Sequence, residues 1–111
     1  MEKRNLYSKN QQALNDMDYI KKSKKYSDEY FQTAQSFHKS RNQAMAIEYL
    51  TRSLGLNPYN AQAHLLLGQI YEKQKNYTGA LINYKAYVGL EPYTKDAAKL
   101  REKIKKFSNK L

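Results

Sequence analysis

The side chains that most often catalyse reactions or bind metals are few and scattered in this sequence. Its two histidines, His38 and His64, fall in different expected helices without a neighbouring cluster of carboxylates, and cysteine is absent. Ser36 and Ser53 have no partner base that their spacing identifies. The 4 glycines are dispersed, so no glycine-rich loop is present to hold a phosphate. We therefore predict no catalytic residues, no metal site and no cofactor.

Tyrosine and lysine together raise a different possibility, because aromatic rings on a basic surface can stack on single-stranded nucleic acid. The chain has 11 tyrosines and a net charge of +10. Apolar spacing assigns four of them to the core, and we expect two of the remainder to pack over turns that follow prolines. The core set is Tyr30, Tyr71, Tyr77 and Tyr84; the candidates for the surface are Tyr7, Tyr19, Tyr26 and Tyr49; the turn pair is Tyr59 and Tyr93.

The positive charge is concentrated at the two ends of the chain. Residues 1–25 carry seven basic and three acidic residues, residues 94–111 carry seven and two, and the segment between them carries six and five. The candidates for binding an anionic surface are Lys21, Lys22, Lys24, Lys25, Lys99, Lys103 and Lys106. Biased composition is the alternative explanation, since 16 of the 20 basic residues are lysine, whereas arginine is favoured where phosphate is gripped.

Length and hydropathy are typical of one small folded domain. The chain has 111 residues, of which 41% are hydrophobic, and its mean hydropathy is −0.94. No apolar run approaches the roughly 18 residues of a membrane span, and the N-terminal residues lack the apolar core of a signal peptide. We therefore expect a cytoplasmic protein.

A repeat organises the chain. The segment Ser-Leu-Gly-Leu-Asn-Pro-Tyr-Asn at residues 53–60 returns as Tyr-Val-Gly-Leu-Glu-Pro-Tyr-Thr at residues 87–94, with Pro58 and Pro92 separated by 34 positions. A period of this length is typical of stacked helical hairpins. The sequence thus predicts an all-α fold without strands.

Polar and helix-breaking residues mark where the helices start and stop. Asn and Thr side chains can accept a hydrogen bond from a first-turn amide, and proline cannot continue a helix. The expected N-terminal caps are Asn42, Asn60, Asn76 and Thr94, and the expected helices span residues 27–40, 43–56, 61–74, 77–90 and 95–108. The chain then divides into a basic N-terminal segment at 1–26, repeats at 27–60 and 61–94, and a basic C-terminal segment at 95–111.

Small and large residues alternate on the apolar stripes of these helices. Ala34 and Gly68 precede Phe37 and Tyr71 by three positions, so we expect close helix contacts there, with each ring covering the gap. Enlarging Gly68 is predicted to overpack the contact.

This pattern resembles the tetratricopeptide repeat, a helix-turn-helix unit of the same period. The second repeat matches through Leu67-Gly68, Tyr71, Tyr77, Ala80, Tyr84 and Pro92, and the first through Tyr30, Ala34, Phe37, Ala46 and Pro58. His64 replaces a large aromatic residue, and Tyr87 replaces a small one, so Tyr87 either uses room beside Ala97 and Ala98 or points outward.

Two hairpins need a cover at each end. The apolar stripe of residues 95–108, which includes Leu100 and Phe107, predicts a C-terminal capping helix. Ala13, Leu14, Met17 and Ile20 suggest another helix near 9–22 that packs on the first hairpin, after a flexible tail at 1–8 and before a solvated connection at 21–25. An apolar stripe that stays uncovered would become an interface, either with a protein partner or with a second copy of the chain in a homo-oligomer.

The resemblance implies a protein-binding groove lined by the first helix of each hairpin. Its expected residues are Phe31, Gln35, His38, Lys39, Leu65, Gln69, Glu72 and Lys73. Phe31 and Leu65 are the candidate apolar anchors, unless they contact the N-terminal helix of the same chain. Because Phe31, Gln35 and Leu66 occupy positions that are polar in family members that clamp a chaperone's C-terminal carboxylate, that clamp is not expected.

These patterns favour a non-enzymatic adaptor or scaffold that binds a peptide or helix of another protein. The alternative is an RNA-associated or ribonucleoprotein-associated protein anchored by its lysine-rich ends, for which binding would weaken steeply with salt. A third possibility is that the lysine-rich C-terminal helix rests on an anionic lipid surface.

Overall fold

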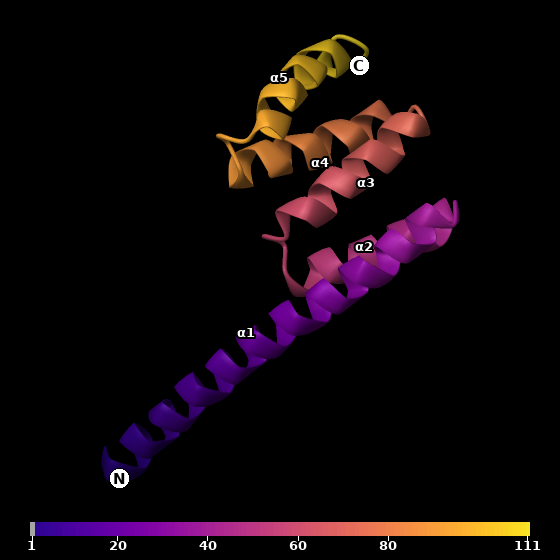
Figure 1. Ribbon diagram of the computed structural model, residues 1–111. Coiled ribbons are helices and arrows are strands. Elements are labelled where there is room, and N and C mark those ends of the chain that lie inside the picture. Colours follow the sequence, from indigo (N-terminus) through magenta and orange to yellow (C-terminus); the bar gives the residue numbers. More distant parts are fainter. Residues whose placement is uncertain (1) are drawn as a thin grey trace.

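A computed structural model shows five helices that follow one another as a staggered stack (Figure 1). It describes the backbone of residues 2–111 and the side chains of residues 16–111. The helices are α1 (Glu2–Lys39), α2 (Gln43–Leu56), α3 (Ala61–Lys73), α4 (Tyr77–Leu90) and α5 (Lys95–Ser108). Consecutive helices are in contact, and the contacts are most extensive between α1 and α2 and between α3 and α4, which form the two expected hairpins. The predicted all-α repeat fold is confirmed.

Each of the last four helices begins after a residue whose side chain caps it. The cap oxygen accepts the backbone N–H of the third residue onward at 3.2 Å for Asn42 and Asn60 and at 3.0 Å for Asn76 and Thr94. These bonds satisfy amides that a helix leaves unpaired at its start. All four predicted caps are confirmed, and the predicted bounds of α2 to α5 hold to within one residue.

The turn inside each hairpin contains one residue with a positive φ angle, at the same position of the repeat. The sequence pattern did not reveal it. Arg41 and Lys75, which occupy equivalent positions of the two repeats, have φ angles of 61° and 60°. The amides of Asn42 and Asn76 then bond back to Phe37 O and Tyr71 O, each at 2.9 Å. This left-handed closure, usually made by glycine, reverses the chain tightly enough to lay the two helices of a hairpin side by side.

The second hairpin interlocks through two glycine contacts. A Cβ added to Gly68 would lie 2.6 Å from the Tyr84 ring, and one added to Gly79 would lie 2.8 Å from the Tyr71 ring. Each ring therefore occupies space that a glycine leaves on the opposite helix. Gly68 is buried, as predicted, but the prediction that Tyr71 covers it is wrong, because Tyr84 of α4 does so.

Helix α5 covers the exposed side of the second hairpin. Leu100 and Phe107 are 4% and 5% exposed, and the Phe107 ring lies 5.0 Å from that of Tyr77 and 6.4 Å from that of Tyr84, centroid to centroid. Tyr87 points inward into the same cluster as Ala97, and its hydroxyl lies 3.1 Å from Oγ1 of Thr94. The expected C-terminal capping helix is thus present, and the inward alternative holds for Tyr87.

His64 of α3 faces both α4 and the turn that precedes the second hairpin. Its Nδ1 lies 3.1 Å from Oδ1 of Asn83, and its Nε2 lies 2.9 Å from the carbonyl oxygen of Pro58. A large hydrophobic ring at this position would provide packing, whereas the imidazole brings one ring nitrogen within hydrogen-bonding distance of α4 and the other within that distance of the loop between the hairpins.

The first hairpin is joined at its open end by two buried serines. Ser27 Oγ donates to the backbone oxygen of Ser53 at 2.7 Å, Ser53 Oγ donates to that of Ser27 at 2.8 Å, and the two hydroxyls lie 2.9 Å apart. Because both side chains are small and fully satisfied, α1 and α2 approach closely there.

Helix α1 corrects three expectations about the N-terminal segment. It runs without a break through residues 21–25, which were expected to connect two helices, and it includes residues 2–8, which were expected to be a tail. Lysine and serine do not interrupt a helix, and Asp18 pairs with Lys22 at 3.1 Å one turn later. The stripe consequently cannot fold back on the hairpin: Met17 and Ile20 are 58% and 53% exposed, while Ala13 and Leu14 lie outside the described side chains.

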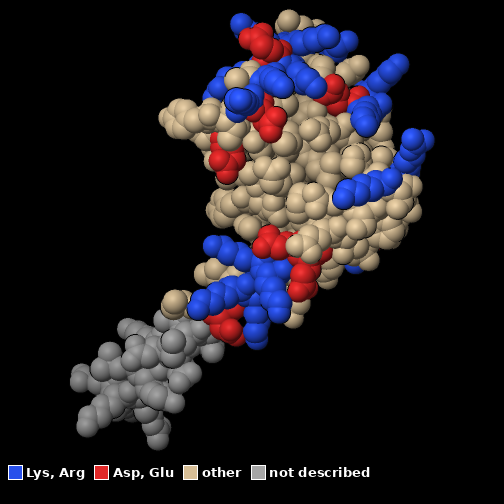
Figure 2. Space-filling model, in the orientation of Figure 1, with Lys and Arg blue, Asp and Glu red and all other residues tan. Residues whose placement is uncertain are grey.

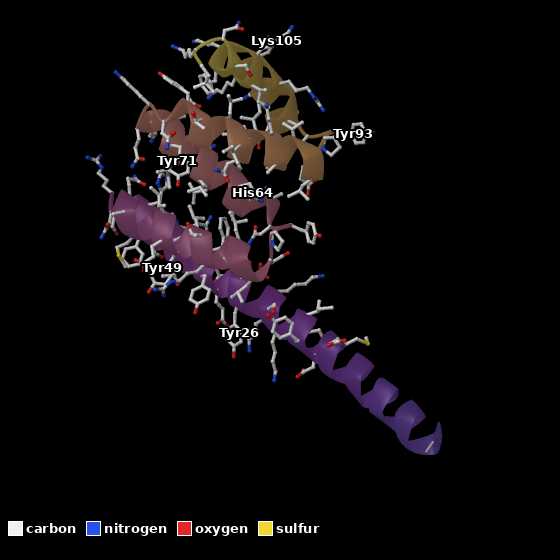
Figure 3. The ribbon with its side chains drawn as sticks, turned by 180° about the vertical axis from the view of Figure 1, so that it is seen from behind. Tyr26, Tyr49, His64, Tyr71, Tyr93 and Lys105 are labelled. Atoms are coloured by element: carbon white, nitrogen blue, oxygen red, sulfur yellow. The ribbon has the colours of Figure 1, made fainter. Side chains whose placement is uncertain are left out.

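The predicted positions of several tyrosines also need correction. Tyr59 and Tyr93 are 75% and 98% exposed, so neither packs over its turn, and Figure 3 shows Tyr93 standing clear of the chain between α4 and α5. Tyr49, expected at the surface, is partly buried between Tyr30 and Phe37. Tyr19 and Tyr26 are exposed as predicted, whereas the side chain of Tyr7 is outside the described part.

Candidate protein-binding groove

A pocket of about 280 Å³ lies where the first helices of the two hairpins approach α5. It is lined by His38 of α1, Gln69, Glu72 and Lys73 of α3, Tyr84 of α4 and Lys103 of α5. Its volume is below the roughly 300–1,000 Å³ of typical small-molecule sites. Six side chains from four helices thus form a site that suits one side chain of a partner better than a cofactor.

One carboxylate in the lining of the pocket, that of Glu72, connects three helices. The Tyr84 hydroxyl donates a hydrogen bond of 2.7 Å to Oε1 of Glu72, and Lys103 Nζ lies 3.0 Å and 3.3 Å from the two Glu72 oxygens. Lys103 Nζ also lies 6.0 Å from the Tyr84 ring centroid, within range of a cation–π contact. Glu72 thereby links α3 to both α4 and α5.

The surroundings of Glu72 favour its charged form. Burial opposes the charge, but hydrogen bonds from Tyr84 and Lys103, with the positive charges of Lys103 and Lys106, outweigh this and hold the pKa of Glu72 below its usual range. Burial, followed by the hydrogen bond to Glu72 and its negative charge, raises the pKa of Tyr84 above its usual range. Tyr84 therefore stays a neutral donor and Glu72 a charged acceptor at neutral pH.

Four of the eight residues predicted for the groove line this pocket: His38, Gln69, Glu72 and Lys73. Gln69 and Lys73 are exposed and available to a ligand, whereas His38 is partly buried, with Nδ1 3.0 Å from Oε1 of Gln43.

The other four predicted residues lie outside the lining of the pocket. Gln35 and Lys39 are exposed on α1. Phe31 is partly buried against the core shared by α1, α2 and α3, and Leu65 is partly buried against the core shared by α4 and α5. Part of each apolar side chain therefore supports the stack itself.

Tyr84 and Lys103 were missing from the predicted groove. Apolar spacing assigned Tyr84 to the core, correctly for its ring, but spacing does not say where the hydroxyl points. Lys103 was predicted only as one of a line of anion-binding lysines, and its approach to Glu72 across 31 positions depends on how α5 folds back.

The predicted anion-binding lysines are exposed and fall into two groups. Lys99, Lys103 and Lys106 lie on α5, and Lys21, Lys22, Lys24 and Lys25 lie on α1. Figure 2 shows basic residues gathered at these two ends of the visible face, with mostly uncharged surface between them. Lys103 is engaged by Glu72 and Lys22 by Asp18. Anchoring to RNA remains a prediction.

Two further classes of site were sought in the described part of the chain. Among side chains 16–111, no three His, Asp or Glu residues lie close enough to hold a metal ion. Within the same residues, no helix has both the length and the apolar character needed to cross a membrane.

Comparison with known families gives a match over the two hairpins. The family model for the tetratricopeptide repeat matches residues 30–60 and 61–94, which include the cap residues and both glycine contacts. No curated protein matches the chain.

Proposed function

Because this chain belongs to the tetratricopeptide repeat family, whose repeats generally mediate protein–protein interaction, we propose that it is a non-enzymatic adaptor that holds a segment of another protein in the groove of α1, α3 and α5. The observation that carries the proposal is the convergence of His38, Gln69 and Lys73, from both hairpins, on one side-chain-sized pocket.

The charge of the pocket indicates what kind of segment fits. The only acid in its lining, Glu72, is neutralised by Lys103, while Lys73 and Gln69 remain exposed at the rim. A partner side chain with an acidic or amide oxygen would accept hydrogen bonds from Lys73 and Gln69. The exposed parts of the partly buried Phe31 and Leu65 side chains would then contact apolar neighbours in the same segment.

The test is affinity capture with the double variant Gln69→Ala/Lys73→Ala. Both residues are exposed, so the fold should persist, and thermal unfolding verifies this. We expect the variant to lose at least one protein that the wild type captures from lysate of the native source, while Lys85→Ala, on an exposed face of α4 outside the pocket, retains it. Identical captured sets for the wild type and the double variant would reject the groove.

A further inference from the structure

The N-terminal half of α1 presents a second surface, separate from the groove. A pocket of about 350 Å³ lies between this part of α1 and the turn after α2, lined by Tyr19, Ile20, Ser23, Lys24, Leu56, Asn57, Pro58 and Tyr59. Four large apolar side chains on or beside it are more than half exposed: Met17 at 58%, Tyr19 at 70%, Ile20 at 53% and Tyr59 at 75%. So much apolar surface in one place marks a site of interaction.

This surface continues the face of α1 that α2 covers. Ser27 and Ala34, each 0% exposed, lie on that face against α2. At about 100° per residue, Ile20 lies about 20° around the helix from Ser27, and Met17 lies about 80° from it, at the edge of the same face. Helix α2 ends at Leu56 and the chain turns away into α3, so α1 extends beyond its partner (Figure 1). The space beside Ile20 is therefore shaped for a helix lying roughly in line with α2.

The charges around the surface indicate which kind of partner it would bind. Residues 16–25 hold four lysines and two aspartates, and one of the aspartates, Asp18, pairs with Lys22. Lys24 lines the pocket, and Lys21 follows Ile20 directly on the helix. A second copy of the chain would bring the same lysines and a net charge of +10, so self-pairing is opposed by repulsion. An acidic partner is attracted instead.

We propose that the α1 surface formed by Met17, Tyr19, Ile20, Lys24 and Tyr59 docks an amphipathic helix of another protein, with an apolar stripe flanked by acidic residues. The stripe of that helix covers Ile20 and Met17 and contacts the Tyr59 ring, and its flanking carboxylates approach Lys21 and Lys24. This surface is independent of the groove, so the chain would hold two partner segments at once.

The experiment uses two synthetic helical peptides of about 18 residues with one leucine stripe, flanked by glutamate in the first and by lysine in the second. Binding to the full chain is followed by fluorescence anisotropy. We expect the glutamate peptide to bind at least about tenfold more tightly than the lysine peptide. Equal affinities, or no binding of the glutamate peptide, would overturn the proposal.

The chain offers a closely matched pair of variants. Ile20→Ala/Tyr59→Ala alters the proposed surface, while Ile82→Ala/Tyr93→Ala removes the same residue types at positions elsewhere that are somewhat more exposed, Ile82 at 64% and Tyr93 at 98%. Ile20→Ala/Tyr59→Ala should weaken binding of the glutamate peptide by at least about tenfold, and Ile82→Ala/Tyr93→Ala should leave it unchanged. Equal losses in both variants would contradict the assignment.

Two further measurements complete the test. The groove variant Gln69→Ala/Lys73→Ala should bind the glutamate peptide as the wild type does, and a loss there would place the peptide in the groove instead. Sedimentation velocity reports on self-association: a dimer that Ile20→Ala/Tyr59→Ala dissociates would show that a second copy covers the surface, contrary to the proposal.

Discussion

The two ends of the stack carry similar apolar stripes, but only the stripe at the C-terminal end is buried. At the C-terminal end, Leu100 and Phe107 of α5 are almost completely buried against the second hairpin, whereas at the N-terminal end Met17 and Ile20 are more than half exposed. The difference lies in the chain between stripe and hairpin. Pro92 and Thr94 stop α4 and start α5, so that α5 can fold back, while residues 21–25 contain no residue that stops a helix. An apolar stripe is therefore buried by its own chain only where a turn allows the helix that carries it to fold back on the hairpins.

The strongest test of this comparison truncates one residue from each stripe. Phe107→Ala removes a buried ring that contacts Tyr77 and Tyr84, and should lower the free energy of unfolding by about 3–5 kcal/mol. Ile20→Ala should change it by less than about 0.5 kcal/mol, because that side chain is already exposed. Urea unfolding followed by circular dichroism measures both. Similar losses would show that the N-terminal stripe is covered in solution.

A smaller effect is expected from adding one methyl group beneath Tyr84, whose ring stacks on Phe107. Gly68→Ala places a Cβ 2.6 Å from that ring and should cost about 1–3 kcal/mol. Gly89→Ala is the control, since a Cβ there meets nothing within 4 Å, and it should stabilise the protein by about 0.5–1 kcal/mol through helix propensity. Thermal unfolding gives the sign for each, and a stabilising Gly68→Ala would mean that the C-terminal end is loosely packed.

The turn that returns α5 can be weakened directly. Thr94→Ala removes the cap of α5 and the hydroxyl beside Tyr87, with an expected loss of about 1–2 kcal/mol. Thr33→Ala, on the exposed face of uninterrupted α1, removes only a bond to the Glu29 carbonyl oxygen one turn earlier and should cost less than about 0.5 kcal/mol. Hydrogen exchange of α5 amides should rise in the first variant alone. Unchanged protection of α5 would argue against the turn as the cause of the difference between the ends.

The smallest expected effect concerns the contact of Glu72 with Lys103, which fastens α5 to α3. Because the pKa of Glu72 is lower in the folded chain than its unfolded value of 4.5, its charge stabilises the fold above pH 4.5, and this contribution disappears as the pH falls through the folded pKa. Lys103 is partly exposed, so we expect less than about 1 kcal/mol. The stability difference between wild type and Glu72→Gln should shrink from pH 7 to pH 3. A difference that grows on acidification would contradict the assigned direction.

Local signals predicted most of the repeat core. Asn42, Asn60, Asn76 and Thr94 act on amides three positions away, so their roles follow from the sequence, and the period of 34 residues placed the same signals in both hairpins. The left-handed turns at Arg41 and Lys75 escaped notice because neither residue is glycine. The straight course of α1 was missed because a cluster of lysines was interpreted as a connection.

Of the residues that line the candidate pocket, the sequence predicted only those on α1 and α3. Helical periodicity put His38, Gln69, Glu72 and Lys73 on one side of the first helices, because residues three or four positions apart share a face. Tyr84 and Lys103 come from helices whose approach depends on long-range packing, so their meeting at Glu72 could not be anticipated. The same holds for the N-terminal surface, where Ile20 and Tyr59 become neighbours through the end of α2.

The order of residues fixes the helices, their caps and the hairpin repeat, since each of these depends on interactions within a few positions of the chain. Tertiary packing decides which apolar stripe is buried, where the Tyr84 hydroxyl points and which lysine reaches Glu72. Those outcomes depend on contacts between segments that lie far apart in the sequence, and they are settled only when the helices compete for the same space.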